Sequence, residues 1–508
     1  MSRLKKVSAA AWLGGGLYAL LFAFGWQAEH LGESRPAAAL AAAALLLVPA
    51  SLLLQFLFGL TDRKSGAGRP FRPGAAFALM LVCWLPSFVV HFPGSFAYDV
   101  PFQLEQAAGG AYSTHHPLLH TLLLSGCVHL GRLAGSANAG AALYSTVQML
   151  LLALCFTLSC ASIARQAGDG SARRAALFFA LYPLNMLMAV NATKDVLFTG
   201  CFVLTFALVR EALCGGSVRA VQLLWPAVLS VLLRNNMAYA LAAFIVLLFF
   251  FRRFRPAGIL AAALALAVLS GGLLARSLSA SGGDVRETLS LPIQQVARVS
   301  CLEREKLTDD ERAAISYVMP GMIWRAYDPT VSDPVKFGFD SRPLREEPGK
   351  YLSVYLGVLR KCPKCCFDAA LMLTHAFLYP YGRYAVSGYY LQTGITEAAY
   401  TGWGTERITD LSPLPRLRQA IAWRFGAKGA MQVPVLGWLF NMGLINWALL
   451  FFVLRSLGKG RKGEALAGAL PLLLLGTFLL GPVMAGRYIY PFVCSLPVAA
   501  AAAEKKEG

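Results

Sequence analysis

The chain has 508 residues, of which 57% are hydrophobic and 14% charged, and its mean hydropathy is +0.55. A soluble protein carries nearer a quarter charged residues, so this composition excludes an ordinary soluble domain. The formal net charge of +19 does not indicate a nucleic-acid partner. Lys and Arg gather in short loops between apolar runs, as the positive-inside rule requires, and no nucleic-acid-binding motif is evident.

The apolar runs, taken in chain order, predict an all-α polytopic membrane protein with about 12 transmembrane helices. The long ones reach the ~20 residues that a bilayer-spanning helix needs, and they lack the alternation of barrel strands. The first run follows a basic start but has no small-x-small cleavage pattern, so we interpret it as an uncleaved span. The expected spans are 9–27, 37–60, 74–92, 138–164, 175–190, 195–213, 220–235, 237–251, 257–275, 433–454, 464–483 and 486–502.

Basic loops orient these spans, because Lys and Arg are enriched on the cytoplasmic side. The loops that carry them lie near residues 5, 63–72, 165–174, 252–255 and 455–462 and at the C-terminal end. This pattern predicts a multi-pass protein of the cell membrane, a bacterial plasma membrane, with both termini cytoplasmic and membrane lipids as its surroundings. It requires that two apolar stretches, Leu118–Leu133 and 367–379, lie in the outer interface without crossing.

The same orientation divides the chain into three parts. Residues 1–275 form a transmembrane helical module whose first external loop is 93–137. Residues 276–432 form an extracytoplasmic segment with interfacial helices, which we expect to be folded because it contains amphipathic pieces such as 289–299. Residues 433–508 supply the C-terminal transmembrane helices.

The first external loop carries several polar residues with chemical potential. Asp99 follows a span directly, Gln103 comes four residues later, and a His115-His116-Pro117 turn opens an apolar helix, where proline suits the first helical position. Taken singly, Asp99 could cap a turn and the histidines could be interfacial side chains. Because these residues share one loop, we favour catalytic roles for Asp99, His115 and His116, with Gln103 supporting them.

Cationic residues mark the outer ends of later spans. Lys194-Asp195 opens one span, Arg234-Asn235 lies between two others, and Arg487-Tyr488 opens the last. Two arginines on the outer face run against the positive-inside bias, and cations near lipid are costly without an anionic partner. We therefore expect Lys194, Arg234 and Arg487 to bind a phosphate, with Asp195, Asn235 and Tyr488 in support. The plainer interpretation is a Lys194–Asp195 ion pair between neighbours and arginines that cap helix carbonyls.

These elements resemble the GT-C glycosyltransferases, integral-membrane enzymes that include protein mannosyltransferases and aminoarabinose transferases. The resemblance is carried by short motifs in three places: Asp99 with the turn at His115-His116-Pro117, the loop Asn191-Ala-Thr-Lys194-Asp195, and Gly486-Arg487-Tyr488-Ile-Tyr490-Pro491. It implies a polyprenyl-phosphate sugar as donor and an envelope glycan, lipid or protein as acceptor.

One departure from that family bears on cofactors. Many members carry two adjacent acids in the first loop, whereas Val100 follows Asp99 here and the next acid is Glu105. A divalent metal prefers several carboxylate ligands, so a metal is not favoured and no cofactor is expected. We therefore predict a sugar transfer that inverts the configuration of the anomeric carbon, with Asp99 as the general base.

Two other functions stay open at this point. A polysaccharide polymerase or ligase that uses lipid-pyrophosphate glycans would need the same cations on the outer face. A lipid or solute transporter would instead call for charges near the membrane midplane and for broken helices, whereas the charges here lie at the ends of the spans.

Overall fold

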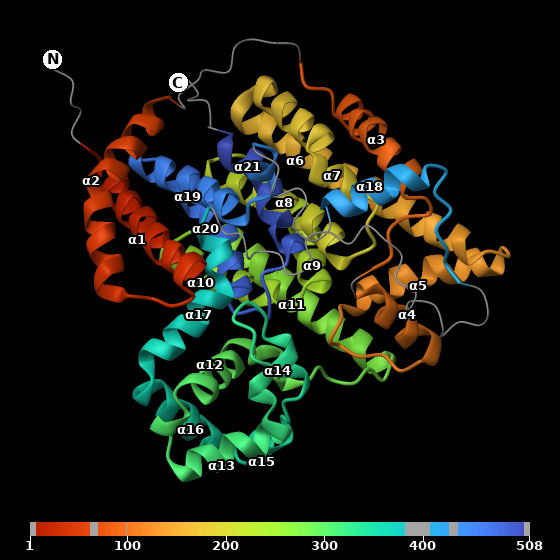
Figure 1. Cartoon of the computed structure of the whole chain (residues 1–508). Coiled ribbons are helices and arrows are strands. Elements are labelled where there is room, and N and C mark those ends of the chain that lie inside the picture. Colours follow the sequence, from red (N-terminus) through yellow and green to blue (C-terminus); the bar gives the residue numbers. More distant parts are fainter. Residues whose placement is uncertain (1–6, 61–69, 98, 381–406, 426–434, 502–508) are drawn as a thin grey trace.

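The computed structural model describes residues 7–60, 70–97, 99–380, 407–425 and 435–501 (Figure 1). These parts of the chain are helical, and the only β-structure within them is a few isolated bridges. The prediction of an all-α protein is confirmed for the described residues. Several long apolar helices make it a membrane-embedded protein.

Within the described residues, six helices are long and apolar enough to cross a bilayer. They coincide with six of the expected spans and are α1 (Ala9–Leu31), α2 (Pro36–Leu60), α3 (Pro73–Val90), α6 (Ala137–Leu181), α8 (Lys194–Leu213) and α11 (Phe254–Ser277). The further apolar helices are shorter: α5 (Leu118–Leu133), α9 (Ala220–Leu233), α10 (Met237–Phe250), α19 (Met442–Gly458), α20 (Lys462–Phe478) and α21 (Tyr490–Ala500). A helix of 14 residues rises only about 21 Å, against ~30 Å of hydrocarbon, so the count of twelve full spans is not confirmed.

The expected spans 138–164 and 175–190 are built differently from the prediction. The first of them lies in α6, whose helical geometry is interrupted at Ala167 and Gly168, within the basic stretch expected to separate the two spans. The helix α6 ends at Leu181, and the short helix α7 (Pro183–Met188) follows. Pro183 has no N–H to continue the helix, so the expected span at 175–190 is broken in two.

The buried axis of the molecule is α8, whose side chains are nearly all covered by α6, α9, α20 and α21. Its 20 residues rise about 30 Å, which matches the hydrocarbon thickness of a bilayer. Lys194 and Asp195 stand at one end of this helix, and Arg210 and Glu211 stand at the other. The charged residues of α8 are therefore separated into two groups by about one bilayer thickness.

At the Arg210 end, buried ion pairs tie α8 to its neighbours. Arg210 lies 3.2 Å from the Glu464 carboxylate. Glu211 accepts two hydrogen bonds from Arg165, at 2.7 and 2.8 Å. Each buried carboxylate thus has a cationic partner, which offsets the cost of removing it from water.

Residues 284–362 form a helical subdomain with a hydrophobic core of its own, on one side of the bundle in Figure 1. The amphipathic piece expected at 289–299 is the helix α12. The elements are η1 (Val285–Thr288), α12 (Ser290–Leu302), η2 (Arg304–Lys306), α13 (Asp309–Val318), η3 (Pro320–Ala326), α14 (Asp333–Phe337), α15 (Arg342–Glu346) and α16 (Pro348–Lys361).

The stretch 367–379, expected in the interface, belongs to α17 (Pro363–Leu378), which packs against α1, α12 and α19. Its His375 lies 3.1 Å from Glu29 of α1, and both side chains are buried. The remaining elements are α4 (Val100–Gly109), α18 (Pro415–Phe425), η6 (Leu436–Phe440) and η7 (Gly486–Ile489).

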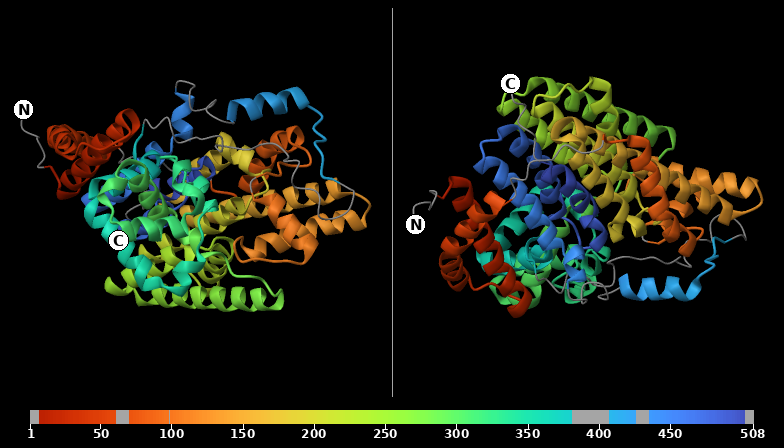
Figure 2. Two further views of the ribbon diagram at one scale, coloured as in Figure 1. Left: turned by 60° about the horizontal axis from the view of Figure 1, so that its bottom comes forward. Right: turned by 90° about the horizontal axis from the view of Figure 1, so that it is seen from above.

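Figure 2 shows the α1–α2 hairpin and the α4–α5 region at opposite ends of the molecule. At the α4–α5 end, the backbone of α5 lies in close contact with the backbone at the start of α6. A Cβ added at Gly140 would lie 2.6 Å from Val128 Cα, and one at Gly131 would lie 2.1 Å from Gly140 N. Small residues allow such close approach in membrane helices, and this contact positions the loop that precedes α5.

Gly140→Ala should therefore separate α5 from α6 and lower the thermal unfolding midpoint of the detergent-solubilised protein, since overpacking costs about 1–3 kcal/mol. The matched control is Gly126→Ala in α5, where an added Cβ meets no atom within 4 Å. The control should leave the midpoint unchanged or raise it, because alanine favours helix over glycine by up to ~1 kcal/mol. Equal midpoints for the two variants would contradict the close packing.

Candidate functional site

Two loops that are far apart in sequence pair through their backbones at the Lys194 end of α8. Ser95 N donates to Val190 O at 2.9 Å, and Ala192 N donates to Ser95 O at 2.8 Å. Just before this pairing, Gly94 adopts φ 138°, and a Cβ there would collide with Ser145 Oγ. The pairing sets the loop after α3 beside the loop before α8.

This arrangement brings Asp99, at the start of α4, against Lys194, at the start of α8. Lys194 Nζ donates to Asp99 Oδ2 at 2.8 Å. Arg487, from η7, places Nη2 3.6 Å from the other oxygen, Asp99 Oδ1. The Asp99 carboxylate is thus shared by two cations from distant parts of the chain.

The environment of Asp99 stabilises its ionised form. Burial acts to raise the pKa of Asp99, but the positive charges of Arg487 and Lys194 outweigh it and hold the pKa well below its usual range. Opposite charges within a few ångströms favour the charged carboxylate. Asp99, the base expected from the sequence, is therefore a carboxylate whose charge is balanced by Lys194 and Arg487.

His116 faces the same group, whereas His115 does not. His116 is buried, with Nδ1 3.9 Å from Asp99 Oδ2 and 3.4 Å from Lys194 Nζ. Burial and the charge of Lys194 lower the pKa of His116 to about 3, so this imidazole is neutral at neutral pH. His115 is exposed and lies edge-to-face against His116, with ring centroids 4.5 Å apart.

The pairing expected between Lys194 and its neighbour Asp195 is wrong. Asp195 is buried and forms ion pairs with Arg234 through Oδ1 and with Arg487 Nε through Oδ2, at 3.6 Å. Adjacent residues at the start of a helix point in different directions, so Lys194 and Asp195 each take a partner from another segment. Arg487 then bridges both carboxylates of the cluster.

Arg234 lies deeper than the other two cations and is enclosed by aromatic rings. Its guanidinium carbon lies 4.3 Å from the ring centroid of Phe478, 5.0 Å from that of Tyr488 and 5.6 Å from that of Phe198. Its Nε donates to Asn236 Oδ1 at 3.0 Å. Cation–π contacts of this kind stabilise a guanidinium, so Arg234 is held where it pairs with Asp195, while Lys194 and Arg487 face Asp99.

The residues expected in supporting roles lie in three different places. Tyr488 packs against both arginines, with the guanidinium of Arg487 5.3 Å from its ring centroid. Asn235 is directed at the first loop, where its Nδ2 donates to Thr114 O at 3.2 Å. Gln103 forms its described hydrogen bonds with His120 and Thr121 of α5.

The sequence interpretation missed a buried polar chain behind the site. His120 contacts Gln103 Oε1 at 3.0 Å and the Tyr144 hydroxyl at 2.8 Å, and Tyr144 donates to Gln148. Gln148 Nε2 then donates to Asn191 O at 2.9 Å, which connects this chain to the loop that carries Lys194. The available signal was the pair Tyr144 and Gln148, polar groups spaced four residues apart on one face of an apolar span.

The cluster as a whole is cationic. Among the described residues, three positive side chains, Lys194, Arg234 and Arg487, meet two negative ones, Asp99 and Asp195. Within the described residues, no group of three or more His, Cys, Asp or Glu side chains is placed to hold a metal ion. The geometry is suited to an anion that competes with Asp99 for Lys194 and Arg487.

In comparisons with curated proteins and with solved structures, nothing matched this chain. A family model described as "Family of unknown function (DUF6020)" matches residues 109–507. This region includes α5 to α21 and therefore His115, His116, Lys194, Asp195, Arg234 and Arg487 of the cluster, although Asp99 precedes it. Because the match covers well over half of the chain, the protein belongs to the DUF6020 family.

Proposed function

We propose that this protein is a GT-C-like inverting glycosyltransferase that moves a sugar from a polyprenyl-phosphate donor to an acceptor of the cell envelope. The observation that carries the proposal is the Asp99 carboxylate shared by Lys194 and Arg487. A carboxylate beside two cations supplies both parts of such a reaction: a base for the acceptor and a binding place for the phosphate that leaves. The motifs that resemble the GT-C enzymes contain these same three residues.

The proposed orientation puts this cluster on the outer face of the membrane. The basic loop Arg252–Arg253–Phe254–Arg255 lies at the other end of the bundle, beyond the Leu213 end of α8. The positive-inside rule assigns that end to the cytoplasm, and both chain termini with it. A donor in the outer leaflet would then reach Lys194 and Arg487 from the side.

The proposed reaction forms one glycosidic bond and breaks another. The acceptor hydroxyl gives its proton to an Asp99 oxygen and attacks the anomeric carbon of the donor. The bond from that carbon to the phosphate oxygen breaks, and its electron pair leaves with polyprenyl phosphate. Lys194 and Arg487 stabilise the charge that builds on this phosphate, which is the usual use of fixed cations in transfer reactions.

Donor binding also accounts for how a carboxylate with a low pKa acts as a base. The phosphate of the donor takes hydrogen bonds from Lys194 and Arg487, the two cations that hold the pKa of Asp99 low. As these cations turn toward phosphate, the carboxylate becomes more basic. His116, which is neutral, contributes a hydrogen bond without adding charge.

Asp99→Asn preserves the shape of the side chain and removes its base, so transfer should fall by roughly 10²–10⁴-fold. The assay uses the purified protein in lipid nanodiscs with polyprenyl-phosphate mannose, glucose and aminoarabinose, and it measures release of polyprenyl phosphate in the presence of an envelope extract as acceptor. Glu105→Gln, an exposed acid in the same segment, is the matched control and should keep full activity. Release of polyprenyl phosphate from none of these donors, with release from lipid-pyrophosphate glycans instead, would replace the proposal with a polymerase or ligase.

Arg487→Lys keeps the charge but loses the planar guanidinium that contacts both Asp99 and Asp195. We expect transfer to fall at least about tenfold, while the amount of protein inserted in the membrane stays within about twofold of wild type. Arg325→Lys, an exposed arginine of the subdomain, serves as the control. Unchanged turnover in Arg487→Lys would remove the guanidinium from phosphate binding.

The low pKa of Asp99 makes a prediction about pH. The ratio kcat/KM reports the protonation states of the free enzyme, in which Asp99 stays ionised well below its usual pKa. The wild-type ratio should therefore stay flat as pH falls from 7 to about 5, since Asp99 takes up its proton only at lower pH. Arg487→Gln removes one of the positive charges that lower the pKa of Asp99. The fall of kcat/KM on the acidic side of its pH profile should therefore begin at a higher pH in this variant. A wild-type limb near pH 6 that persists unchanged in Arg487→Gln would contradict this assignment.

A further inference from the structure

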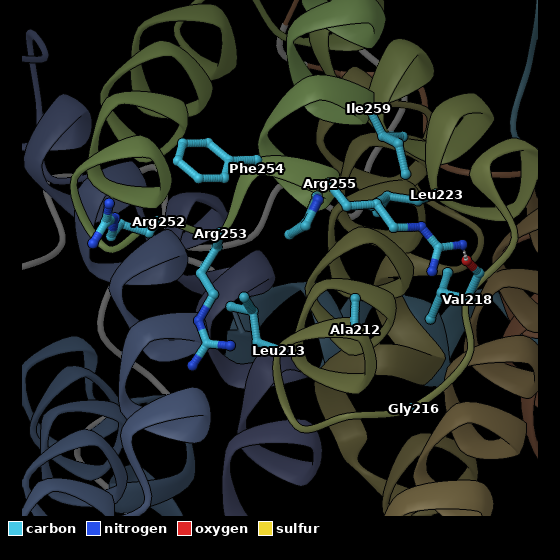
Figure 3. A pocket seen from close by; sticks show the side chains of 11 residues that line it. Ala212, Leu213, Gly216, Val218, Leu223, Arg252, Arg253, Phe254, Arg255 and Ile259 are labelled. Atoms are coloured by element: carbon cyan, nitrogen blue, oxygen red, sulfur yellow. Dashed lines mark hydrogen bonds between the residues drawn. The ribbon is translucent and has the colours of Figure 1, made fainter.

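A cavity of about 350 Å³ lies at the opposite end of the bundle from the Asp99 cluster. Figure 3 shows it between the end of α8, the start of α9 and the turn from α10 into α11. Three arginines stand along one side of it. The lining residues are Ala212, Leu213, Gly216, Val218, Leu223, Arg252, Arg253, Phe254, Arg255, Pro256 and Ile259.

The arginines of this cavity are not neutralised by the protein. Among the described residues, no carboxylate pairs with Arg252, Arg253 or Arg255, and Arg255 Nη2 donates to the Val218 carbonyl at 3.1 Å (Figure 3). Glu211, an acid at the nearby end of α8, is paired with Arg165. Three positive charges thus line one side of a space that no acidic side chain lines, which favours an anionic occupant.

The neighbouring side chains set the depth of the cavity in the membrane. Phe250 is 78% exposed, Phe254 59% and Phe251 53%, and they share the run Phe250-Phe251-Arg252-Arg253-Phe254-Arg255 with the three arginines. Exposed aromatic side chains beside arginines are typical of the level where lipid headgroups meet the acyl chains. Leu213, Leu223 and Ile259 make part of the cavity lining apolar, and this part fits the portion of a ligand that lies next to a charged head.

We infer that this cavity binds the phosphate headgroup of an anionic phospholipid from the leaflet at the Arg252–Arg255 end of the protein. Basic pockets between membrane helices recognise anionic lipids in this way. A free phosphate would use the arginines but not the apolar wall or the exposed phenylalanines. The inference does not rest on the proposed glycosyl transfer, because the two sites lie at opposite ends of α8.

The test measures the thermal unfolding midpoint of the full chain in a neutral detergent. Additions of phosphatidylglycerol, phosphatidylcholine and inorganic phosphate are compared. A lipid that binds only the folded protein stabilises it by mass action, so phosphatidylglycerol should raise the midpoint by about 2–4 °C and the other two additions should not. An equal rise with inorganic phosphate would show a free-anion site, and an equal rise with phosphatidylcholine would show no headgroup selection; either result overturns the inference.

Variants localise the effect to the cavity. R253Q/R255Q should lose most of the rise with phosphatidylglycerol, whereas R253K/R255K should keep part of it because the charges remain. The matched control R72Q/K462Q removes two exposed cations from other basic loops and should keep the full rise.

A further variant, Ala212→Trp, keeps all three arginines and fills the apolar part of the cavity, and it should also lose the rise. This variant provides a second test if R253Q/R255Q fails to fold. A full response to phosphatidylglycerol in Ala212→Trp or in R253Q/R255Q would show that the lipid binds elsewhere.

Discussion

Charged side chains next to a membrane need partners of opposite charge. In this protein the partners come from the ends of helices that are distant in sequence. Asp99 takes Lys194 and Arg487, and Asp195 takes Arg234 and Arg487. An unpaired ion near lipid costs several kcal/mol. Removing one side chain of the cluster would therefore leave the charge of its partner unpaired. The cluster therefore fixes the relative positions of α4, α8, α9 and η7, and the other features of this face follow from it.

Hydrogen bonds to the backbone hold the segments that carry this cluster on two sides. The Ser95–Asn191 bridge sets the first loop beside the start of α8, and Arg418 of α18 donates to the carbonyls of Phe92 and Gly94 just before it. On the other side, Ser332 of the subdomain donates to Pro482 O, close to the segment that carries Arg487. This hydrogen bond ties the subdomain to the segment that leads into η7 and Arg487.

The placement of charge along α8 divides the molecule into two functional ends. At the Lys194 end, carboxylates and cations are interleaved, so an arriving anion must compete with Asp99 for its cations. At the Leu213 end, the Arg252–Arg255 turn faces an acid-free cavity, so an anion can enter without displacing anything. The first arrangement suits a substrate that binds and leaves, and the second suits a resident lipid.

The sequence by itself determined the features that depend on neighbours along the chain. Hydropathy over ~20 residues located α1, α2, α3, α6, α8 and α11, amphipathic spacing located α12, and the charge bias of the loops placed Asp99, Lys194, Arg234 and Arg487 at the same end of their helices.

Only the tertiary structure decided which of these groups meet. The partner of Lys194 is Asp99, 95 residues away, and not the adjacent Asp195, because neighbours at a helix start diverge in direction. The break at Pro183 and the buried chain from Gln103 through His120 to Tyr144 also escaped the sequence interpretation. Each depends on how helices pack side by side, and hydropathy averaged along a single segment contains no information about its neighbours in space.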